Sequence, residues 1–567
     1  MAAPFAFGPF RLDRARRVLW RGDALVDVAP RALDVLIALV EHAGDVVTKE
    51  ELLQRVWPDT FVEEANLSVN ISALRKALGT GEGGHAYIQT VPRRGYRFVA
   101  ARNAARPPAP RPAIAVLPFR DLAPVGSDEY LGVGTSIALI SRLSRLSGIV
   151  VRPTSAILKY VDAAPPPQDA IRDLRVDAIV EGTIQRSGNR VRVTVGLVRA
   201  GEDAASWNDA FEEEMTGLFA VQDAAAEQVV RALDVELRGP DRAVLARRDT
   251  ADPQASQAYL KGRYFWSRFT GEWMTRAFAC FQDAVERDPR YALPHAGLAD
   301  AYLVLGFSGA VAPGEAWPLA EESARTALGL DASLADAHIS LAFVRLFRDW
   351  DWEGARASLR RALDSSPGAA AHQWYGLFRA MEGRLDDARR EIERAAELEP
   401  LSIVTGALRG LERNLEGDHQ GELAQMRATV ELDPNHFVAH WGLALAHEHA
   451  GRMEDSAASL RRAMELADGG ALLAAVLART EALCGRPAEA RRMIADLDVA
   501  PGHPSQYQRA AAALALGDRE DALRRLESAA TAREPWMVLI AVDPMLTGLR
   551  GDPTFEALVR RVFATQA

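Results

Sequence analysis

Residues 64–78, EANLSVNISALRKAL, are the stretch that decides the fold of the N-terminal region. Apolar side chains recur there every three or four positions, which predicts an amphipathic helix with one face in a core. The apolar positions are Leu67, Ile71, Leu74 and Leu78. The opposite face carries Ala65, Val69, Ser72, Ala73 and Lys76, and the flanks carry Asn66, Asn70 and Arg75. Small outward residues with cations near the helix end suit the major groove of DNA, although an ordinary surface helix shows the same pattern.

A predicted hairpin follows this helix. Strand-like runs at 87–91 and 96–99 flank the turn Pro92-Arg93-Arg94-Gly95. Paired arginines on a rigid turn suit a minor groove or a phosphate backbone, whereas the hairpin alone is more typical of a solvated turn. The order of helix and hairpin favours DNA binding. The candidate DNA-binding residues are Asn66, Val69, Asn70, Ser72, Arg75, Lys76, Arg93, Arg94 and Arg97.

The residues before this helix predict strands followed by two further helices. Alternating phenylalanines at the N-terminus are typical of a strand, and Pro30 is a good first residue for a helix. Thr48 and Glu51 form a capping box, and Pro58 ends the helix that the box begins. We therefore expect a winged helix-turn-helix domain of the α+β class over residues 1–103.

Four segments of this domain resemble the OmpR/PhoB-type winged helix, and the resemblance covers residues 5–100. They are PRALDVL at 30–36, VTKEEL at 47–52, ISALRKAL at 71–78 and IQTVPRRGYRF at 88–98. The resemblance implies that residues 64–78 read the major groove of double-stranded promoter DNA and that the hairpin touches the minor groove. It also implies that the loop 58–64 faces RNA polymerase. Arg75 and Lys76 match positions that contact DNA in the family, while Asn70, Ser72 and Ala73 depart from its usual arginine or histidine.

The layout of the chain resembles that of CadC/HilA-type regulators, because the winged helix begins the sequence and no receiver domain precedes it. Control by phosphorylation of a receiver is therefore not supported, although the family is related to phosphorelay proteins. The CadC branch carries a membrane helix, and we expect none here, because no stretch of about 18 uninterrupted apolar residues occurs.

The middle of the chain predicts a small α/β domain at 113–240, after a proline-rich linker at 104–112. Expected strands lie at 113–119, 149–152, 178–185 and 190–197, and expected helices lie at 130–146 and 219–237. The segments AIAVLPF at 113–119, VEGTI at 180–184 and FAVQD at 219–223 resemble a TolB/FlgO-like module. The resemblance implies a sensory or assembly module without known catalysis.

The last part of the chain, 251–567, predicts an all-α tetratricopeptide solenoid of about eight helix pairs and a C-terminal helix. The glycines at 383, 417, 451, 485 and 517 recur at spacings close to 34 residues, the period of this repeat. The expected units begin near residues 258, 292, 335, 369, 403, 437, 471 and 503.

The cysteine usage fits a reducing compartment, and we expect the protein in the cytoplasm. The two cysteines, Cys280 and Cys484, lack the spacing of a disulfide framework or zinc cluster. The chain has a net charge of −10. Residues 1–111 hold more Lys and Arg than Asp and Glu, which agrees with a polyanion partner for that domain only.

No catalytic, cofactor or metal site is predicted. Gly132-Val133-Gly134 is better interpreted as a helix start than as a dinucleotide site, and no phosphate-binding loop of the Gly-x-x-x-x-Gly-Lys-Ser/Thr type occurs. A histidine cluster, His436, His440, His447 and His449, offers a metal site as the weaker alternative to helix packing.

We therefore expect a DNA-binding transcriptional regulator, specifically an activator, that senses or assembles through its repeat array. We expect no enzymatic activity. The partners are promoter DNA, RNA polymerase and a peptide or protein in the groove of the array, with a homodimer left open. The alternative is an interaction scaffold whose main functional surface is the array itself.

Overall fold

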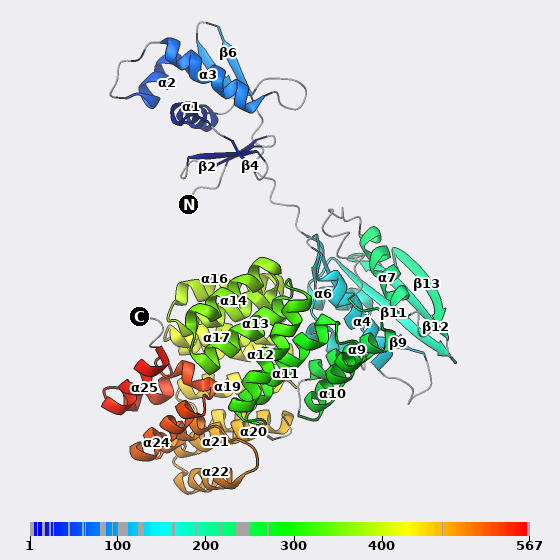
Figure 1. The fold of residues 1–567 in the computed structure, drawn as a ribbon, viewed down its shortest axis with the longest axis vertical. Helices are drawn as coiled ribbons and strands as arrows, with labels where there is room; N and C mark the ends of the chain where they lie inside the picture. The colour runs from blue at the N-terminus through cyan, green and yellow to red at the C-terminus, as the bar shows by residue number, and fades with distance from the viewer. Residues whose placement is uncertain are drawn as a thin grey trace. The chain divides into compact units, whose positions relative to one another are not determined.

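A computed structural model gives the fold (Figure 1). It describes residues 5–7, 10–13, 17–21, 24–26, 28–42, 46–58, 62, 64–79, 87–92, 94–99, 111–122, 130–146, 148–161, 165–188, 190–202, 205–214, 218–233, 249–268, 271–467 and 469–563. The expected linker at 104–112 lies outside these residues except for Arg111 and Pro112. Contacts within the chain divide it into two compact units, Met1–Arg111 and Pro112–Ala567.

The first unit is a winged helix, which confirms the expected fold class. Its N-terminal antiparallel sheet has the strands β1 (Phe5–Phe7), β2 (Phe10–Asp13), β3 (Val18–Arg21) and β4 (Ala24–Leu25). The helices are α1 (Pro30–Glu41), α2 (Lys49–Val56) and α3 (Glu64–Leu78). A second sheet, in the order β5-β7-β6, joins β5 (Val46–Thr48), β7 (Gly95–Phe98) and β6 (Ile88–Val91).

Local sequence features set the boundaries of these elements. The capping box is present at the start of α2: Glu51 N–H donates to Thr48 Oγ1 at 3.2 Å, and Thr48 N–H donates to Glu51 Oε2 at 2.8 Å. After α3, Gly79 adopts a left-handed backbone with φ +66°. Gly95 begins β7 where the strand lies against β5, and a Cβ there would stand 2.0 Å from the carbonyl oxygen of Val47. Only glycine therefore permits this pairing.

The second unit begins with a mixed sheet in the order β10-β8-β11-β12-β13, with β9 also paired to β11. The strands are β8 (Ala113–Val116), β9 (Arg120–Asp121), β10 (Val150–Val151), β11 (Ala178–Ser187), β12 (Arg190–Arg199) and β13 (Trp207–Glu214). The helices are α4 (Tyr130–Leu143), α5 (Thr154–Ile157), α6 (Pro167–Leu174) and α7 (Leu218–Ala232), with a short 3-10 turn, η1 (Leu158–Tyr160). Their apolar faces share one core with the sheet.

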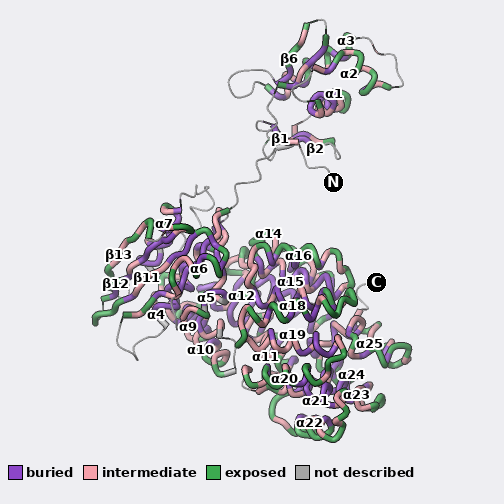
Figure 2. The backbone as a smooth tube through the Cα atoms, turned by 180° about the vertical axis from the view of Figure 1, so that it is seen from behind, coloured by how far each residue is buried: buried purple, intermediate pink, exposed green. Residues whose placement is uncertain are grey.

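Helix pairs fill the rest of this unit. Among its described residues the pairs are α9 (Pro253–Arg268) with α10 (Gly271–Arg287), α11 (Ala292–Ser308) with α12 (Pro313–Leu330), α13 (Ala335–Val344) with α14 (Trp352–Ser365), α15 (Ala369–Met381) with α16 (Leu385–Leu398), α17 (Ile403–Leu415) with α18 (His419–Leu432), α19 (Phe437–His449) with α20 (Met453–Leu466), α21 (Ala471–Leu483) with α22 (Pro487–Val499), and α23 (Gln506–Ala515) with α24 (Arg519–Thr531). The glycines that define the period stand between the partners of the later pairs, all with positive φ. Figure 2 shows buried residues along the facing sides of these helices.

Irregular elements interrupt and end this array. A π-helical turn, η3 (Arg345–Asp349), extends α13, and the chain finishes with η4 (Pro535–Leu539), η5 (Pro544–Leu549) and α25 (Pro553–Phe563). No described helix is long and apolar enough to cross a membrane.

One arginine joins the mixed sheet to the array. Arg152, which follows β10 and is buried, donates to Leu174 O at 2.8 Å and to Arg175 O at 2.6 Å, at the end of α6. Its third nitrogen donates to Leu398 O at 3.1 Å, at the end of α16. A cation is stabilised at helix C-termini, where carbonyl groups lack partners, so Arg152 fixes two helix ends at once.

Candidate nucleic-acid interface

The orientation of α3 agrees with its sequence pattern. Its four apolar side chains, Leu67, Ile71, Leu74 and Leu78, are buried in the core of the first unit. Asn66, Val69, Ser72 and Lys76 are exposed. Val69 keeps 66% of its surface exposed, the largest value among the exposed large apolar side chains of this unit. The helix therefore presents an outward face that no described part of its own unit covers.

Two polar side chains on α3 bond back to the helix itself. Asn70 Nδ2 donates to Asn66 O at 2.8 Å, and Ser72 Oγ donates to Ser68 O at 2.9 Å. Each side chain thereby uses one hydrogen-bond donor within the helix. The side-chain amide oxygen of Asn70 and the hydroxyl oxygen of Ser72 remain available as acceptors. Asn66 is exposed, and only its backbone oxygen takes part in that bond.

Arg75 lies between α3 and the β6–β7 hairpin, which is the wing of the domain. Its Nε and Nη2 donate to Ile88 O at 3.0 and 2.9 Å, and Nη2 also donates to Thr90 Oγ1 at 2.7 Å. The guanidinium thus holds strand β6 against the helix. The sequence predicts a DNA contact for Arg75, and in the structure the side chain is half-buried with its guanidinium bonded to the wing.

The wing offers cations at its tip. Arg94 is exposed, and its backbone N–H donates to Val91 O at 3.1 Å, which closes the turn. Arg93 lies outside the described residues. Arg97, on β7, is half-buried, and its Nε has no hydrogen-bond partner among the described residues.

An ion pair at the start of α3 and hydrogen bonds at its end hold this helix in the domain. Lys49, at the start of α2, pairs with Glu64 at 2.6 Å, and this hydrogen bond raises the pKa of Lys49. Arg21, on β3, donates to Ala77 O and Leu78 O at 3.3 Å and stacks on the Phe10 ring at 4.7 Å. Sequence reasoning missed Arg21, because no local pattern links a strand residue to a helix end far along the chain.

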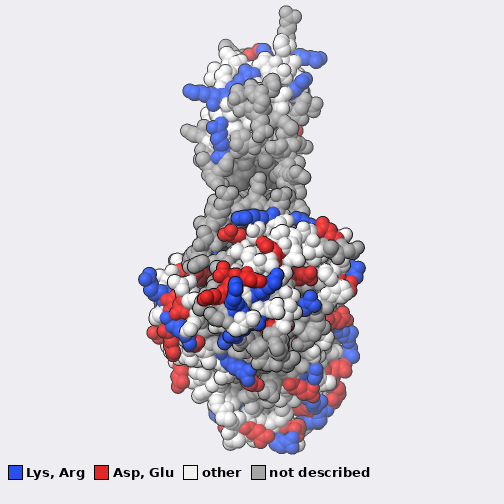
Figure 3. Space-filling model, turned by 90° about the vertical axis from the view of Figure 1, so that its right-hand side faces the viewer, with Lys and Arg blue, Asp and Glu red and all other residues white. Residues whose placement is uncertain are grey.

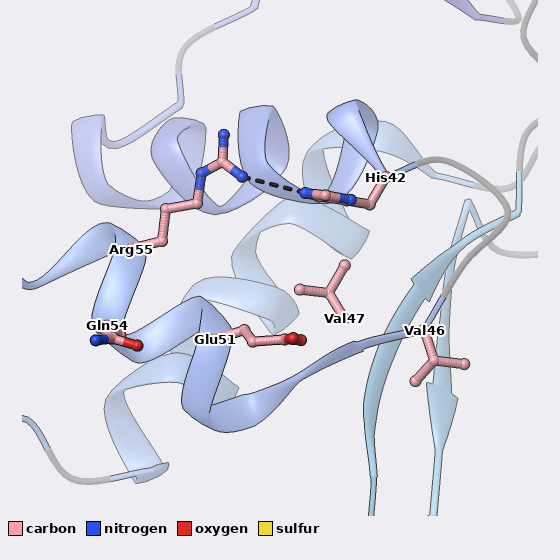
Figure 4. Close-up of a pocket in the computed structure, with 6 residues that line it drawn as sticks. All are labelled: His42, Val46, Val47, Glu51, Gln54 and Arg55. Atoms are coloured by element: carbon pink, nitrogen blue, oxygen red, sulfur yellow. Dashed lines mark hydrogen bonds between the residues drawn. The ribbon is translucent and has the colours of Figure 1, made fainter.

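A cavity of about 430 Å³ lies elsewhere in the first unit. The end of α1, β5 and α2 line it (Figure 4), through His42, Val46, Val47, Glu51, Gln54 and Arg55. Arg55 Nη1 lies 3.2 Å from His42 Nε2 across it. None of these residues belongs to α3 or the wing, so the cavity is separate from the outward face of α3.

Charge also separates the two units. On the face seen in Figure 3, the charged side chains of the first unit are mainly Lys and Arg, whereas Lys, Arg, Asp and Glu mix over the second unit.

The histidines of the cluster in the array do not converge on one point: His449 pairs with Glu422 at 3.0 Å, and the His440 ring lies 2.9 Å from Pro434 O. Within the described ranges, no group of three His, Cys, Asp or Glu residues could hold a metal ion.

The winged helix and the mixed-sheet region each match a known protein family. Residues 22–98 match the family "Transcriptional regulatory protein, C terminal", and residues 111–227 match "HilA/YgeH-like transcriptional regulator, second domain". The second match covers most of the region that resembles TolB/FlgO in sequence.

Three relatives illustrate the similarity. Transcriptional regulator HilA of Salmonella typhimurium strain LT2 is 27% identical over 408 residues, 71% of this chain and 72% of its own. Transcriptional activator CadC of Escherichia coli K12 is 35% identical over 80 residues, 14% of this chain and 16% of its own. A Rhizobium meliloti strain 1021 protein, provisionally named adenylate cyclase 3, is 28% identical over 200 residues, 35% of this chain and 34% of its own.

These matches confirm the expected class of function. Residues 22–98 match the C-terminal domain family of transcriptional regulatory proteins, residues 111–227 match the HilA/YgeH-like second-domain family, and the chain is a DNA-binding transcriptional regulator with a helical-repeat array.

Proposed function

We propose that the chain reads promoter DNA by inserting the outward face of α3 into the major groove while the β6–β7 wing contacts the adjacent backbone and minor groove. The uncovered face of α3 carries this proposal, because its buried apolar stripe leaves a row of small and polar side chains directed outward. Such a face lets a helix approach base edges closely.

The side chains on this surface divide by chemistry. Val69 is apolar and exposed, so it suits contact with a thymine methyl group, and Ser72 suits hydrogen bonding to a base edge. Asn66 and Asn70 suit an adenine edge. The cations Lys76, Arg93, Arg94 and Arg97 suit phosphates or the minor groove, and Arg75 acts by fixing the wing.

A binding titration against the chain's own promoter region tests the proposal. Affinity should fall steeply with salt, since each phosphate contact releases counterions. Lys76→Ala and Arg94→Ala should each weaken binding to all sequences and reduce the salt slope by about 1. Arg394→Ala, an exposed arginine on α16, serves as the matched control and should change nothing. Salt-independent binding, or equal effects of all three variants, would contradict the proposed surface.

The same proposal covers domain division, partners and cellular place. We divide the chain into domains at 1–103, 113–240 and 251–567, with a linker at 104–112, and the division of contacts at Arg111 supports the first boundary.

We infer that the chain is an activator and that it contacts RNA polymerase through the loop 58–64, of which residues 59–61 and 63 lie outside the described residues. Binding to promoter DNA favours the cytoplasm, and a homodimer would match a palindromic operator.

We also infer that the chain regulates without catalysis of its own. The match to HilA and to two families of regulator domains supports this, whereas one relative bears the name of a cyclase. Incubation of the full chain with ATP and Mg²⁺ should yield no cyclic AMP above a protein-free blank, and cyclic AMP formation would overturn the inference.

An interaction role for the array is the second candidate function. Helical repeats present extended surfaces to peptide or protein ligands, which supports a partner there. Here, however, the residues after α24 pack against the second, third, fourth and eighth repeats, so a partner that binds this face competes with them. A pull-down in which the array retained a partner while the first unit failed to bind DNA would make the scaffold the main function.

A further inference from the structure

The end of the repeat array returns to its second repeat. His503, ahead of α23, donates its backbone N–H to Gly309 O at 2.8 Å, in the turn after α11. Gly309 has φ +76°, and a Cβ there would stand 2.2 Å from the carbonyl oxygen of His503. The two turns are therefore in direct backbone contact, and the array closes on itself.

The final segment, residues 533–563, reinforces this closure, and we call it the C-terminal clasp. At one end of the clasp, Trp317 Nε1 on α12 donates to Arg533 O at 3.1 Å. At the other end, Trp352 Nε1 on α14 donates to Val562 O at 3.2 Å. The clasp thus holds the second and third repeats through two buried tryptophans.

The clasp also binds the eighth repeat through carboxylates. Glu534 accepts hydrogen bonds from Ser505 Oγ at 2.7 Å and from Gln506 N–H at 2.8 Å, so it satisfies donors at the start of α23. Asp543 accepts a hydrogen bond from Tyr507 Oη at 2.8 Å. The clasp therefore connects the eighth repeat to the second and third repeats.

An aromatic contact lies under the clasp. The Trp536 ring on η4 is 4.5 Å from that of Phe307 on α11 and 5.9 Å from that of Trp441 on α19, measured between centroids. The indole nitrogens of Trp441 and Trp536 are buried and have no hydrogen-bond partner among the described residues. This surface is covered by aromatic packing, but its two donors remain unsatisfied.

Backbone irregularities converge where the clasp meets the third repeat. Trp350 and Arg533 both have left-handed backbones, with φ of 53° and 54°. Such a conformation is unfavourable for residues with a Cβ. The π-helical turn η3 ends at Trp350, and turns of this kind are frequent at functional sites. Three departures from regular structure thus meet at one junction.

Charge at this junction also opposes closure. The guanidinium of Arg533 stacks on the Trp350 ring at 3.7 Å, while that of Arg561 lies 5.9 Å from the same ring. Burial and the neighbouring Arg561 lower the pKa of Arg533, and its Nη1 is buried without a hydrogen-bond partner among the described residues. Asp349 partly offsets this shift, and Arg561 itself pairs with Glu527. A favourable cation–π contact therefore stands against desolvation and a partly compensated like charge.

We propose that the C-terminal clasp is a reversible latch, which opens as a unit at the Trp350–Arg533 junction while the repeats stay folded. The clasp shares one buried core with the second, third, fourth and eighth repeats, but each repeat also packs on its sequence neighbours, and these contacts remain when the clasp opens. Opening uncovers Phe307 and Trp441, and that surface suits a protein segment bearing an aromatic side chain, as the clasp itself does.

Hydrogen exchange of the full chain, read by mass spectrometry, tests the latch. Arg533→Ala should speed exchange in 535–549 and 303–311 by about three- to tenfold, because the stacked cation is lost. Peptides from 385–415 should keep their rates. Arg561 also pairs with Glu527 on α24 at 2.8 Å, so its effect is read in a Glu527→Gln background, where that pair is already absent. In this background Arg561→Gln should slow exchange in the same two regions, since it then removes only a like charge from the junction. Arg394→Ala is the control with an exposed arginine on α16 and should match the wild type.

Two results would overturn the latch. One is exchange of the clasp only together with 385–415, because the clasp would then open only when the array unfolds. The other is a change in the same direction for Arg533→Ala and Arg561→Gln, because the junction would then be ordinary packing. If Arg533→Ala does not fold, the wild type and Arg561→Gln still separate these outcomes.

Discussion

Arg533 and Trp350 face each other from two left-handed backbone positions, with the guanidinium 3.7 Å from the centre of the indole ring. The local sequence predicts neither conformation, because a left-handed backbone is unfavourable for residues other than glycine. The contact between the clasp and the third repeat must offset that unfavourable free energy. The pair is therefore a place where backbone strain and side-chain attraction can be measured separately.

We expect Arg533→Gly to be more stable than Arg533→Ala by about 1 kcal/mol, since both lose the stacked cation but only glycine relieves the left-handed backbone. Urea unfolding followed by tryptophan fluorescence gives the difference. Wild type should be the most stable of the three if stacking outweighs strain. Equal stability of the glycine and alanine variants would mean that the backbone at 533 is not strained.

Gly95→Ala should destabilise the wing and reduce DNA affinity. The added Cβ would lie 2.0 Å from Val47 O, so β7 could no longer pair with β5. We expect a loss of about 2 kcal/mol or more in the stability of the first unit, read by hydrogen exchange in 88–98. Gly314→Ala, at a helix position with open space around its Cα, is the matched control. Unchanged exchange in Gly95→Ala would show that the strands separate without cost.

The winged helix and the repeats could be predicted because their signals are local and periodic. The stripe from Leu67 to Leu78 fixes which side of α3 is buried, and it lies as its spacing predicts. The capping box at Thr48 and the helix end at Gly79 depend on neighbouring residues only. In the array, the recurring glycines take the positive φ that a turn between helices requires.

Other features were missed because their causes lie far along the chain. Strand β13 was not predicted, since its edge position exposes three consecutive glutamates, Glu212 to Glu214, and weakens the apolar alternation. The bonds from Arg75 to β6 and from Arg21 to the end of α3 have no sequence signature. Closure of the array is likewise absent from the repeat pattern, which encodes only contacts between neighbours.

Arg75 and Lys76 should respond differently to truncation although they are adjacent. Arg75→Ala removes three hydrogen bonds to β6, so it should speed hydrogen exchange in 88–91 and also weaken DNA binding. Lys76→Ala should weaken binding without any change in exchange, because Lys76 is exposed. Arg75→Lys should restore little, since lysine lacks the planar fork of donors. Identical exchange for both alanine variants would place Arg75 in the DNA contact alone.

Glu399 should make the second unit less stable as pH rises. It follows α16, beside Leu398, whose carbonyl accepts from Arg152. Burial raises the pKa of Glu399 to about 7, and Arg152 only partly offsets this. A raised carboxyl pKa means that the folded state holds its proton more tightly than the unfolded state. The contribution is therefore present at low pH and is lost as pH rises through about 7.

Glu399→Gln removes that pH dependence, because the amide resembles the protonated acid. The variant should melt close to the wild type at pH 5 and be more stable by about 1 kcal/mol at pH 8, well below the full shift because the side chain keeps some solvent contact. Glu397→Gln, two residues earlier and exposed, provides the control, and its difference from the wild type should not depend on pH. A variant that is less stable than the wild type at pH 8 would mean that the attraction between Arg152 and ionised Glu399 exceeds the cost of burying the charge. The junction between the sheet and the fourth repeat would then be held by an ion pair rather than by the helix-end bonds of Arg152 alone.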